Sequence, residues 1–277
     1  MRVAAVQLNS TDEKDRNLEV AERLVRDAAA AGAELIGLPE KWPVLGGTDA
    51  LRGGAEPLDG PTLSTVGNWA RELGVHILAG SISELDPARE KLLNTSTLID
   101  RDGEIVAAYR KIHMFDVDVG GVTYRESAHE DPGDEVVLAD AGGVAVGLTV
   151  CYDLRFPELY RALAVRGAKL ITVPAAFTLQ TGRDHWEVLL RARAIENQLF
   201  VLAPGQIGKA PPHYESYGRS AIVDPWGVVL ASAPDEECFV VADLDLDALE
   251  KIRARLPALA HRRPEVYESA PAFEASA

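Results

Sequence analysis

Apolar strands and amphipathic helices alternate along the first part of the chain. Residues 3–8 and 34–38 are short apolar runs, which predict buried strands. Between them, apolar residues recur at helical spacing from Glu13 to Ala31, and Gly32 is placed to end that helix. The elements expected next are a helix, a strand and a hairpin, at 61–73, 75–80 and 94–111.

The same order of elements returns in the second half. Apolar runs predict strands at 144–151, 170–173 and 199–203, and helical spacing predicts helices at 157–166 and 185–198. A hairpin turn at Asp224-Pro225-Trp226-Gly227 follows, like the earlier turn at Arg101-Asp102-Gly103. Short segments also match, since Gly32-Ala33-Glu34-Leu35-Ile36 resembles Gly167-Ala168-Lys169-Leu170-Ile171.

These matches indicate an internal duplication. Leu78 and Leu202, Ser96 and Ser220, and Gly103 and Gly227 are each separated by the same 124 positions. We therefore expect an α/β fold of two β-α-β-α-β-β halves related by a pseudo-two-fold axis. If the two sheets pack together, helices cover only their outer faces, which gives a four-layer α-β-β-α sandwich. The expected organisation is a single domain at 1–267 and a C-terminal tail at 268–277.

Composition narrows the class of protein. The 277 residues are 47% hydrophobic and 26% charged, as in ordinary globular domains. Lys and Arg number 28 against 43 Asp and Glu, a net charge of −15, which disfavours nucleic acids and anionic membranes as partners. No apolar run is long enough to span a membrane, and residues 1–17 lack the pattern of a targeting segment. A cytoplasmic location is the expectation.

The chain has two cysteines, too few for a disulfide framework or a four-cysteine metal site. Cys151 follows an apolar strand and precedes a helix with Pro157 in its first turn, where the helix dipole favours a thiolate. The Tyr152 N–H is placed to donate to an oxyanion. A buried structural cysteine remains the alternative at this point. Cys238 lies in the apolar segment 237–241 and is expected in the core.

Two charged residues lie near Cys151 in the expected topology. Glu40 follows the strand at 34–38, and Lys111 ends the first hairpin. Ligands of α/β sheets bind at the carboxyl ends of strands, and buried charges are costly unless they are paired. Each residue alone is also typical of a cap or a sheet edge. His113, Asp116 and Asp118 lack the spacing of metal ligands, so no metal site is expected.

Three segments together carry a family resemblance. Leu38-Pro39-Glu40, Tyr109-Arg110-Lys111-Ile112-His113 and Cys151-Tyr152-Asp153-Leu154-Arg155-Phe156-Pro157-Glu158 resemble the three signatures of the nitrilase superfamily of carbon–nitrogen hydrolases. The resemblance runs from 3–7 to 261–267, nearly the whole chain. It implies the α-β-β-α sandwich that the duplication also predicts.

The resemblance implies a role for each residue. Cys151 is then the nucleophile, Glu40 the general base, and Lys111 the partner of the tetrahedral intermediate together with the Tyr152 N–H. The acyl group passes through a thioester, with no metal or organic cofactor. Glu126, in Tyr124-Arg125-Glu126-Ser127, matches a second glutamate of the family. The alternative is that Glu126 is a solvated loop carboxylate, like its neighbours Glu130, Asp131 and Asp134.

Within the superfamily, residues 115–118, 177–193 and 261–267 resemble the Nit branch. This branch implies a small-molecule substrate, an ω-amide of a dicarboxylate-like compound such as α-ketoglutaramate or deaminated glutathione. The candidates for contact with substrate are Arg155, Phe177 and Arg183. Two departures, both expected at the rim of the pocket, concern substrate choice. Lys41 replaces a small residue or cysteine, and 182–185 reads Gly-Arg-Asp-His where the branch has Gly-Pro-Ala-His.

Other functions stay open from the sequence. An aliphatic amidase or an N-carbamoyl amino acid hydrolase would use the same three residues on a different acyl group. A binding or scaffold member of the superfamily would have lost activity, although all three motif residues are present here. The resemblance also implies a homodimer, or a larger homo-oligomer, associated through the helix after the cysteine.

Overall fold

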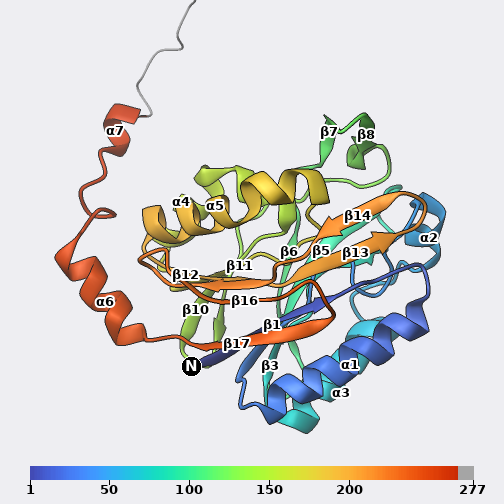
Figure 1. The fold of residues 1–277 in the computed structure, drawn as a ribbon, viewed down its shortest axis with the longest axis horizontal. Helices are drawn as coiled ribbons and strands as arrows, with labels where there is room; N and C mark the ends of the chain where they lie inside the picture. Colours follow the sequence, from blue (N-terminus) through green and yellow to red (C-terminus); the bar gives the residue numbers. More distant parts are fainter. Residues whose placement is uncertain (268–277) are drawn as a thin grey trace, which may run out of the picture.

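The computed structural model describes residues 1–267, and the expected tail at 268–277 lies outside the described residues. Two sheets pack face to face, and helices cover their outer faces (Figure 1). Helices α1 (Lys14–Ala30) and α3 (Pro61–Leu73) cover one sheet, and α4 (Pro157–Val165) and α5 (Leu179–Asn197) cover the other. The predicted α-β-β-α sandwich is confirmed.

The first sheet has nine strands in the order β14-β13-β1-β2-β3-β5-β4, with β6 beside β5 and β17 beside β1. The pairs β1–β2 and β2–β3 are parallel, whereas the pairs β3–β5 and β5–β6 are antiparallel. Their bounds are β1 (Arg2–Leu8), β2 (Leu35–Gly37), β3 (His76–Leu78), β4 (Ile82–Glu84), β5 (Leu93–Ile99), β6 (Ile105–Arg110), β13 (Gly205–Ala210), β14 (Tyr214–Tyr217) and β17 (Cys238–Asp243).

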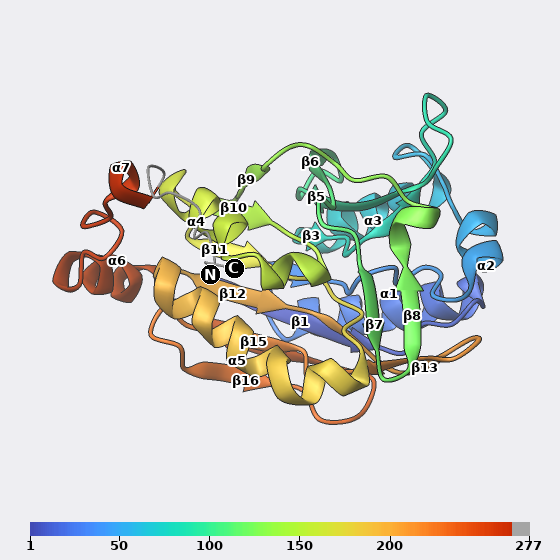
Figure 2. The same ribbon diagram turned by 90° about the horizontal axis from the view of Figure 1, so that it is seen from above.

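The second sheet repeats this arrangement with six strands in the order β16-β15-β12-β11-β10-β9. They are β9 (Leu138–Ala141), β10 (Val144–Leu148), β11 (Leu170–Thr172), β12 (Phe200–Ala203), β15 (Ala221–Val223) and β16 (Val229–Ser232). A separate hairpin, β7 (Asp116–Val119) and β8 (Val122–Arg125), stands at one end of the sandwich (Figure 2). The remaining elements are α2 (Thr48–Gly53), α6 (Leu246–Arg255), α7 (Pro264–Tyr267) and the 3₁₀ turns η1 (Glu126–Ala128) and η2 (Cys151–Arg155).

Strand register supports the duplication. Leu78 pairs with Leu98 in the first sheet, and Leu202 pairs with Ile222 in the second, at the predicted spacing. The register of β5–β6 shifts after Leu98, and that of β15–β16 shifts after Ile222, so the irregularity recurs at the corresponding place. A shared bulge is a specific feature of backbone pairing, since it inserts a residue at one point in a ladder. The halves therefore share a detailed backbone plan.

The central strands are buried on both faces. On β1, Val3 and Ala5 belong to the core between the sheets, whereas Ala4 and Val6 belong to the core under α1 and α3. Successive side chains of a strand point to opposite faces, so each face needs its own apolar set. This requirement explains why the strands appear in the sequence as continuous apolar runs.

Several expected boundaries are wrong. Helix α5 begins at Leu179, not at residue 185, so residues 182–185 are helical. Strand β10 ends at Leu148, because Cys151 opens the turn η2. Cys238 is half-buried at the start of β17, paired with Gln7, and does not lie in the core. Among residues 1–267, no helix is long and apolar enough to cross a membrane.

Candidate active site

A cavity of about 410 Å³ opens beyond the ends of three strands, β2, β6 and β10. Glu40, Lys111 and Cys151 follow β2, β6 and β10, and all three buried side chains line this cavity. Its outer wall comes from α2, the β7–β8 hairpin and the turn between β13 and β14. The topology thus brings together residues that lie far apart in the sequence, at the carboxyl ends of strands.

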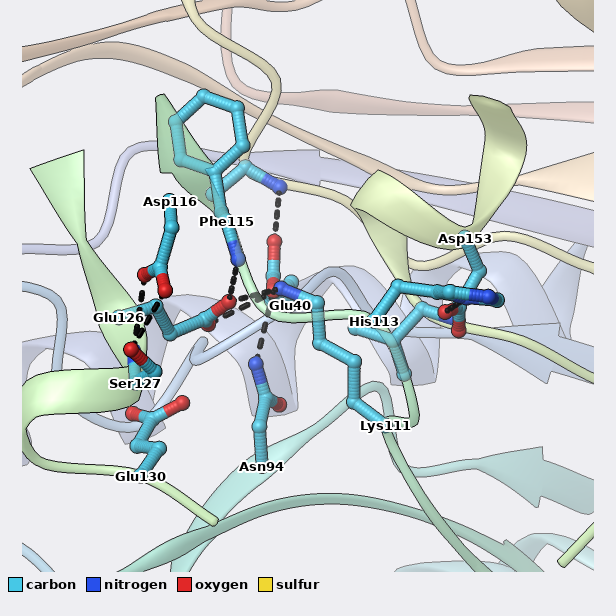
Figure 3. A network of polar contacts seen from close by, with 12 residues as sticks. Glu40, Asn94, Lys111, His113, Phe115, Asp116, Glu126, Ser127, Glu130 and Asp153 are labelled. Carbon is cyan, nitrogen blue, oxygen red and sulfur yellow. Dashed lines mark hydrogen bonds and ion pairs between the residues drawn. The ribbon is translucent and has the colours of Figure 1, made fainter. Parts of the chain in front are cut away.

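Glu40 is held by both halves of the molecule (Figure 3). Its Oε1 accepts hydrogen bonds from Asn94 Nδ2 at 2.8 Å and from Lys111 Nζ at 3.3 Å. Its Oε2 accepts the backbone N–H of Ala176, from the second half, at 2.8 Å. Because three donors point at it, the carboxylate has a defined orientation in a site where an unpaired charge would be costly.

Glu126 lies in the same charge cluster as Lys111. Lys111 Nζ donates to Glu126 Oε1 at 2.9 Å and Oε2 at 2.8 Å, and the Phe115 N–H donates to Oε2 at 2.7 Å. Burial opposes the charge on Lys111, but Glu126 and Glu40 raise its pKa well above the usual value. Burial likewise opposes the charge on Glu126, yet Lys111 and Lys41 hold its pKa well below the usual range. The alternative of a solvated loop carboxylate is wrong.

Cys151 adopts a left-handed backbone conformation, with φ of 46°, and its N–H donates to the Pro174 carbonyl at 3.0 Å. A non-glycine residue in this region is strained, and such strain is common at functional turns. Burial raises the pKa of the Cys151 thiol, and so does the nearby Glu40 carboxylate, which accepts its hydrogen bond, while Lys111 opposes the shift. Burial and Glu40 thus favour the protonated thiol, the opposite direction to the thiolate that the helix beginning at Pro157 is expected to favour.

Asp153 secures the turn that carries the cysteine. Its Oδ2 accepts the Val150 N–H at 2.8 Å and the Tyr109 hydroxyl at 2.7 Å. Its Oδ1 lies 2.7 Å from His113 Nδ1, and the His113 ring stacks on Phe156 with centroids 3.6 Å apart. These contacts tie the end of β6 to η2, so the segments carrying Lys111 and Cys151 are held in one arrangement. The sequence reasoning did not identify this contribution of Asp153.

The substrate-contact candidates divide between the cavity and the surface. Arg155 and Phe177 line the cavity, with Arg155 Cζ 5.1 Å from the Phe177 ring centroid and 5.9 Å from that of Tyr152. Arg155 Nη1 lies 3.3 Å from His185 Nδ1, and no ion pair of this arginine occurs in the described chain. Arg183 is exposed on α5 and is not part of the cavity lining.

Lys41 lies deeper than expected. Its side chain is buried in the cavity wall, and its Nζ lies 2.6 Å from Glu130 Oε1 and 3.5 Å from Glu126 Oε1. Glu130 is 0% exposed. The expectations of a rim position for Lys41 and of a solvated Glu130 are therefore wrong. Residues 182–185, the other departure, belong to α5, where Arg183, Asp184 and His185 are exposed.

Tyr214 is a further residue of the site that the sequence reasoning missed. It comes from β14, lines the cavity, and donates its hydroxyl hydrogen to the Ala176 carbonyl. Burial, together with Cys151 and Glu40, raises the pKa of Tyr214 well above its usual value. The hairpin that carries it has no apolar run of its own, so no pattern in the sequence marks it.

No cluster of ligating side chains for a metal ion occurs within residues 1–267. His113, Asp116 and Asp118 each bond to a different protein partner, namely Asp153, Ser127 and Arg125. The polar groups of the cavity include instead the Glu40 carboxylate, in contact with the Lys111 ammonium and the Cys151 thiol, which is a set suited to acyl transfer.

The family model for carbon–nitrogen hydrolases matches residues 2–254. The chain belongs to the carbon–nitrogen hydrolase family. It is a hydrolase that acts on carbon–nitrogen bonds other than peptide bonds, and its fold and motifs are those of the nitrilase superfamily.

Similar carbon–nitrogen hydrolases span the chain almost completely. It is 43% identical over 267 residues to the deaminated glutathione amidase of Synechocystis, covering 94% of this chain and 97% of that one. It is 39% identical over 268 residues to the bovine omega-amidase NIT2, covering 96% of each. Among solved structures, yeast Nit3, a member of branch 10 of the nitrilase superfamily, has a TM-score of 0.86 at 32% identity, over 95% of this chain and 96% of that chain.

Proposed function

We propose that this protein is a cysteine-dependent amidase that hydrolyses the ω-amide of a small dicarboxylate-like compound to a carboxylate and ammonia. The observation that carries the proposal is the buried contact of Glu40 with both the Cys151 thiol and the Lys111 ammonium on the cavity wall. The names of the relatives, an omega-amidase and a deaminated glutathione amidase, supply the substrate class: α-ketoglutaramate or deaminated glutathione.

In the first half of the reaction, the Cys151 sulfur attacks the amide carbonyl carbon while Glu40 takes the thiol proton. The oxygen of the tetrahedral intermediate lies against the Lys111 ammonium and the Tyr152 N–H, which stabilise its negative charge. As the intermediate collapses, the C–N bond breaks and Glu40 returns the proton to the leaving nitrogen. Ammonia departs, and a thioester remains on Cys151.

In the second half, Glu40 removes a proton from a water molecule that attacks the thioester carbonyl. The C–S bond breaks, the thiol regains its proton, and the carboxylic acid product leaves. Glu126 keeps the Lys111 ammonium in place throughout, through its two hydrogen bonds. Glu40 mediates each proton transfer among the Cys151 thiol, the leaving nitrogen and the attacking water, so the scheme calls for no metal or organic cofactor.

Arg155 is the group we assign to the free carboxylate of the substrate. It lines the cavity, and its Cζ lies 5.1 Å from the centroid of the Phe177 ring. Arginine binds carboxylates through two parallel hydrogen bonds. Arg183 is not given this role, since it lies outside the cavity lining.

A panel of ω-amides and carbamoyl amino acids, scored by ammonia release, tests the proposal. We expect ammonia without carbon dioxide from the ω-amides, and Cys151→Ala to lower kcat/KM by at least about 1,000-fold, since the nucleophile is removed. Cys238→Ala is the matched control and keeps full activity, because this thiol lies on β17. Full activity in folded Cys151→Ala protein contradicts the mechanism, and carbon dioxide release points to the carbamoyl hydrolases.

We also propose that the protein is a cytoplasmic homodimer associated through the face carrying α4, the helix after Cys151, beside which α5 lies. Val165, Val188 and Ile195, on these helices, are each at least half exposed, and exposed apolar side chains that gather on one face are typical of interfaces. Light scattering during gel filtration measures the assembly, and Val188→Glu with Ile195→Glu is expected to give monomers.

A further inference from the structure

Lys41 and Glu130 form a buried ion pair beside the proposed catalytic residues. Lys41 follows Glu40 directly in the sequence, and Glu130 lies one residue beyond the turn that follows η1. The Lys41 ammonium contacts Glu130 at 2.6 Å, although the two residues are 89 positions apart. Burying two charges has a desolvation cost that a hydrophobic pair would avoid. The pair therefore calls for an explanation other than stability.

The pair extends a row of alternating charges. Glu40, Lys111, Glu126, Lys41 and Glu130 follow one another in contact, with N–O distances of 3.3, 2.8, 3.5 and 2.6 Å along the row. Figure 3 shows the carboxylates of Glu40 and Glu126 both reaching the Lys111 ammonium, with Glu130 below Glu126. The Cys151 thiol adjoins the Glu40 end, and Glu130 is the far end.

The balance of charges along the row indicates what Lys41 and Glu130 do. Without Lys41, Glu40 and Glu126 would share one ammonium, and the excess negative charge in a buried site would favour protonation of a carboxylate. Lys41 removes that excess. Glu130 restores it, but burial and Glu126 raise the pKa of Glu130 to about 7 despite the opposing effect of Lys41. Glu130, at the end of the row farthest from Cys151, therefore takes up a proton more readily than a glutamate in water.

We propose that Lys41 is a positioning residue, clamped by Glu130, that holds Glu126 on Lys111 and supplies the second positive charge that balances the carboxylates of Glu40 and Glu126. Lys41 acts through these neighbours and not on the substrate. The proposal rests on the proposed function for the role of Glu40 as the base. It gives this chain a reason to carry a buried lysine directly after Glu40.

Other ionisable groups surround the row. His129 lies beside the pair, and burial, together with Lys41 and Arg52, lowers its pKa, so it stays neutral near pH 7. The groups that face the row from adjoining elements are Arg52 on α2, Asp116 on β7, His129 after η1, Cys151 on η2 and Tyr214 on β14. In the described chain, the ammonium groups in contact with Glu126 are those of Lys111 and Lys41.

The pH profile of kcat/KM tests the role of Lys41, measured with an ω-amide that the wild-type protein hydrolyses. In Lys41→Met, we expect the acidic limb to move up by about one pH unit, so that kcat/KM falls about tenfold on that limb and less than twofold above pH 9. The sign follows from the charge balance, because loss of Lys41 favours the protonated base. Lys41→Arg keeps the positive charge and is expected to keep the wild-type limb.

Two further variants guard against a simple folding defect. The double variant Lys41→Met with Glu130→Gln removes both buried charges and leaves Glu40 and Glu126 with one ammonium group. The acidic limb of its kcat/KM profile is therefore expected to move up as in Lys41→Met. Glu130→Gln alone leaves two carboxylates with two ammonium groups, so its limb should not move up. A loss that is equal at every pH in both Lys41→Met proteins, or an upward shift in Glu130→Gln, overturns the proposal.

A second readout does not depend on the substrate. In a Cys238→Ala background, the rate at which iodoacetamide alkylates Cys151 reports how readily its proton leaves. We expect the pH midpoint of this rate to move up in Lys41→Met and not in Lys41→Arg. If no ω-amide is hydrolysed but this shift occurs, the proposed substrate class fails and the role of Lys41 stands. If ω-amides are hydrolysed and no shift occurs, the role of Lys41 fails alone.

Discussion

The hairpins β5–β6 and β15–β16 turn in the same way. Asp100 Oδ1 and Asp224 Oδ1 each accept two backbone N–H groups across the turn. Gly103 and Gly227 have φ of 80° and 84°, so both turns use a conformation that favours glycine. After these matching turns, the two halves of the molecule differ in the residues that follow.

The end of each hairpin shows the difference. Lys111 follows β6 and is buried between two carboxylates. Counted through the same register, its counterpart after β16 is Asp235, which is exposed and pairs with Arg219 at 3.0 Å. The duplicated backbone therefore carries a buried cation in one half and a surface anion in the other.

The other two proposed catalytic residues have counterparts without a reactive side chain. The counterpart of Glu40 is the fully buried Ala175, and the counterpart of Cys151 is the fully buried Leu8. The cavity lies where the halves meet. The first half contributes Glu40 and Lys111, and the second contributes Cys151. Duplication thus supplied the scaffold twice and the chemistry once, because one cavity needs one set of reacting groups.

The largest expected effect comes from the hairpin ends. Lys111→Met is expected to lower kcat/KM by at least about 100-fold, because an oxyanion partner is lost and the buried carboxylates of Glu40 and Glu126 lose the cation that they share. Asp235→Asn, the matched change in the other half, should stay within about twofold, since surface substitutions have small effects. Circular dichroism establishes that each variant is folded. An equal loss in both would contradict the asymmetric site.

The next effect tests the shared core. Leu78 and Leu202 are fully buried counterparts that pack in the core between the sheets. Replacing either by alanine is expected to lower the free energy of unfolding by about 2–5 kcal/mol, through lost burial and a cavity. Urea denaturation of both variants measures this. Losses that differ by more than about 2 kcal/mol would show that the two halves are packed unequally around the same register.

The smallest effect concerns the turns. A Cβ at position 103 would lie 2.4 Å from the Gly67 carbonyl oxygen, whereas one at position 227 would meet the Ile195 side-chain end at 2.5 Å. Both alanine variants are destabilised by the positive φ, by about 1 kcal/mol. Gly103→Ala should lower the melting temperature more than Gly227→Ala, because the Gly67 backbone can move away from a new Cβ less easily than the flexible end of the Ile195 side chain. Thermal unfolding ranks the two, and the reverse order would contradict this account.

Much of the site was predictable because its residues lie in local motifs. Glu40, Lys111 and Cys151 each end an apolar strand or hairpin, so their convergence follows from topology. Glu126 was predictable from its Glu-Ser pair. The fold followed from apolar runs and the repeated spacing. The start of α5 did not, because regular apolar spacing begins only at Trp186, although Thr178 is an N-cap residue of a favoured type.

The deeper part of the charge row was not predictable. Glu130 lies among acidic loop residues, a pattern typical of solvated surface, and its partner Lys41 is 89 positions away. Burial of such a residue depends on a long-range ion pair that no local pattern records. The prediction that Cys238 lies in the core failed for a related reason. Its apolar neighbours lie on a strand, β17, whose residues are mostly half-buried.

The buried pair also constrains how this sequence can vary. Loss of Lys41 alone leaves Glu130 without a cation, and loss of Glu130 alone leaves Lys41 with only the distant oxygen of Glu126. Changing one buried partner is strongly unfavourable, whereas replacing both by apolar residues costs little. Selection for a stable fold therefore favours joint change at positions 41 and 130 among descendants of this gene, whereas the role proposed for Lys41 favours keeping the pair.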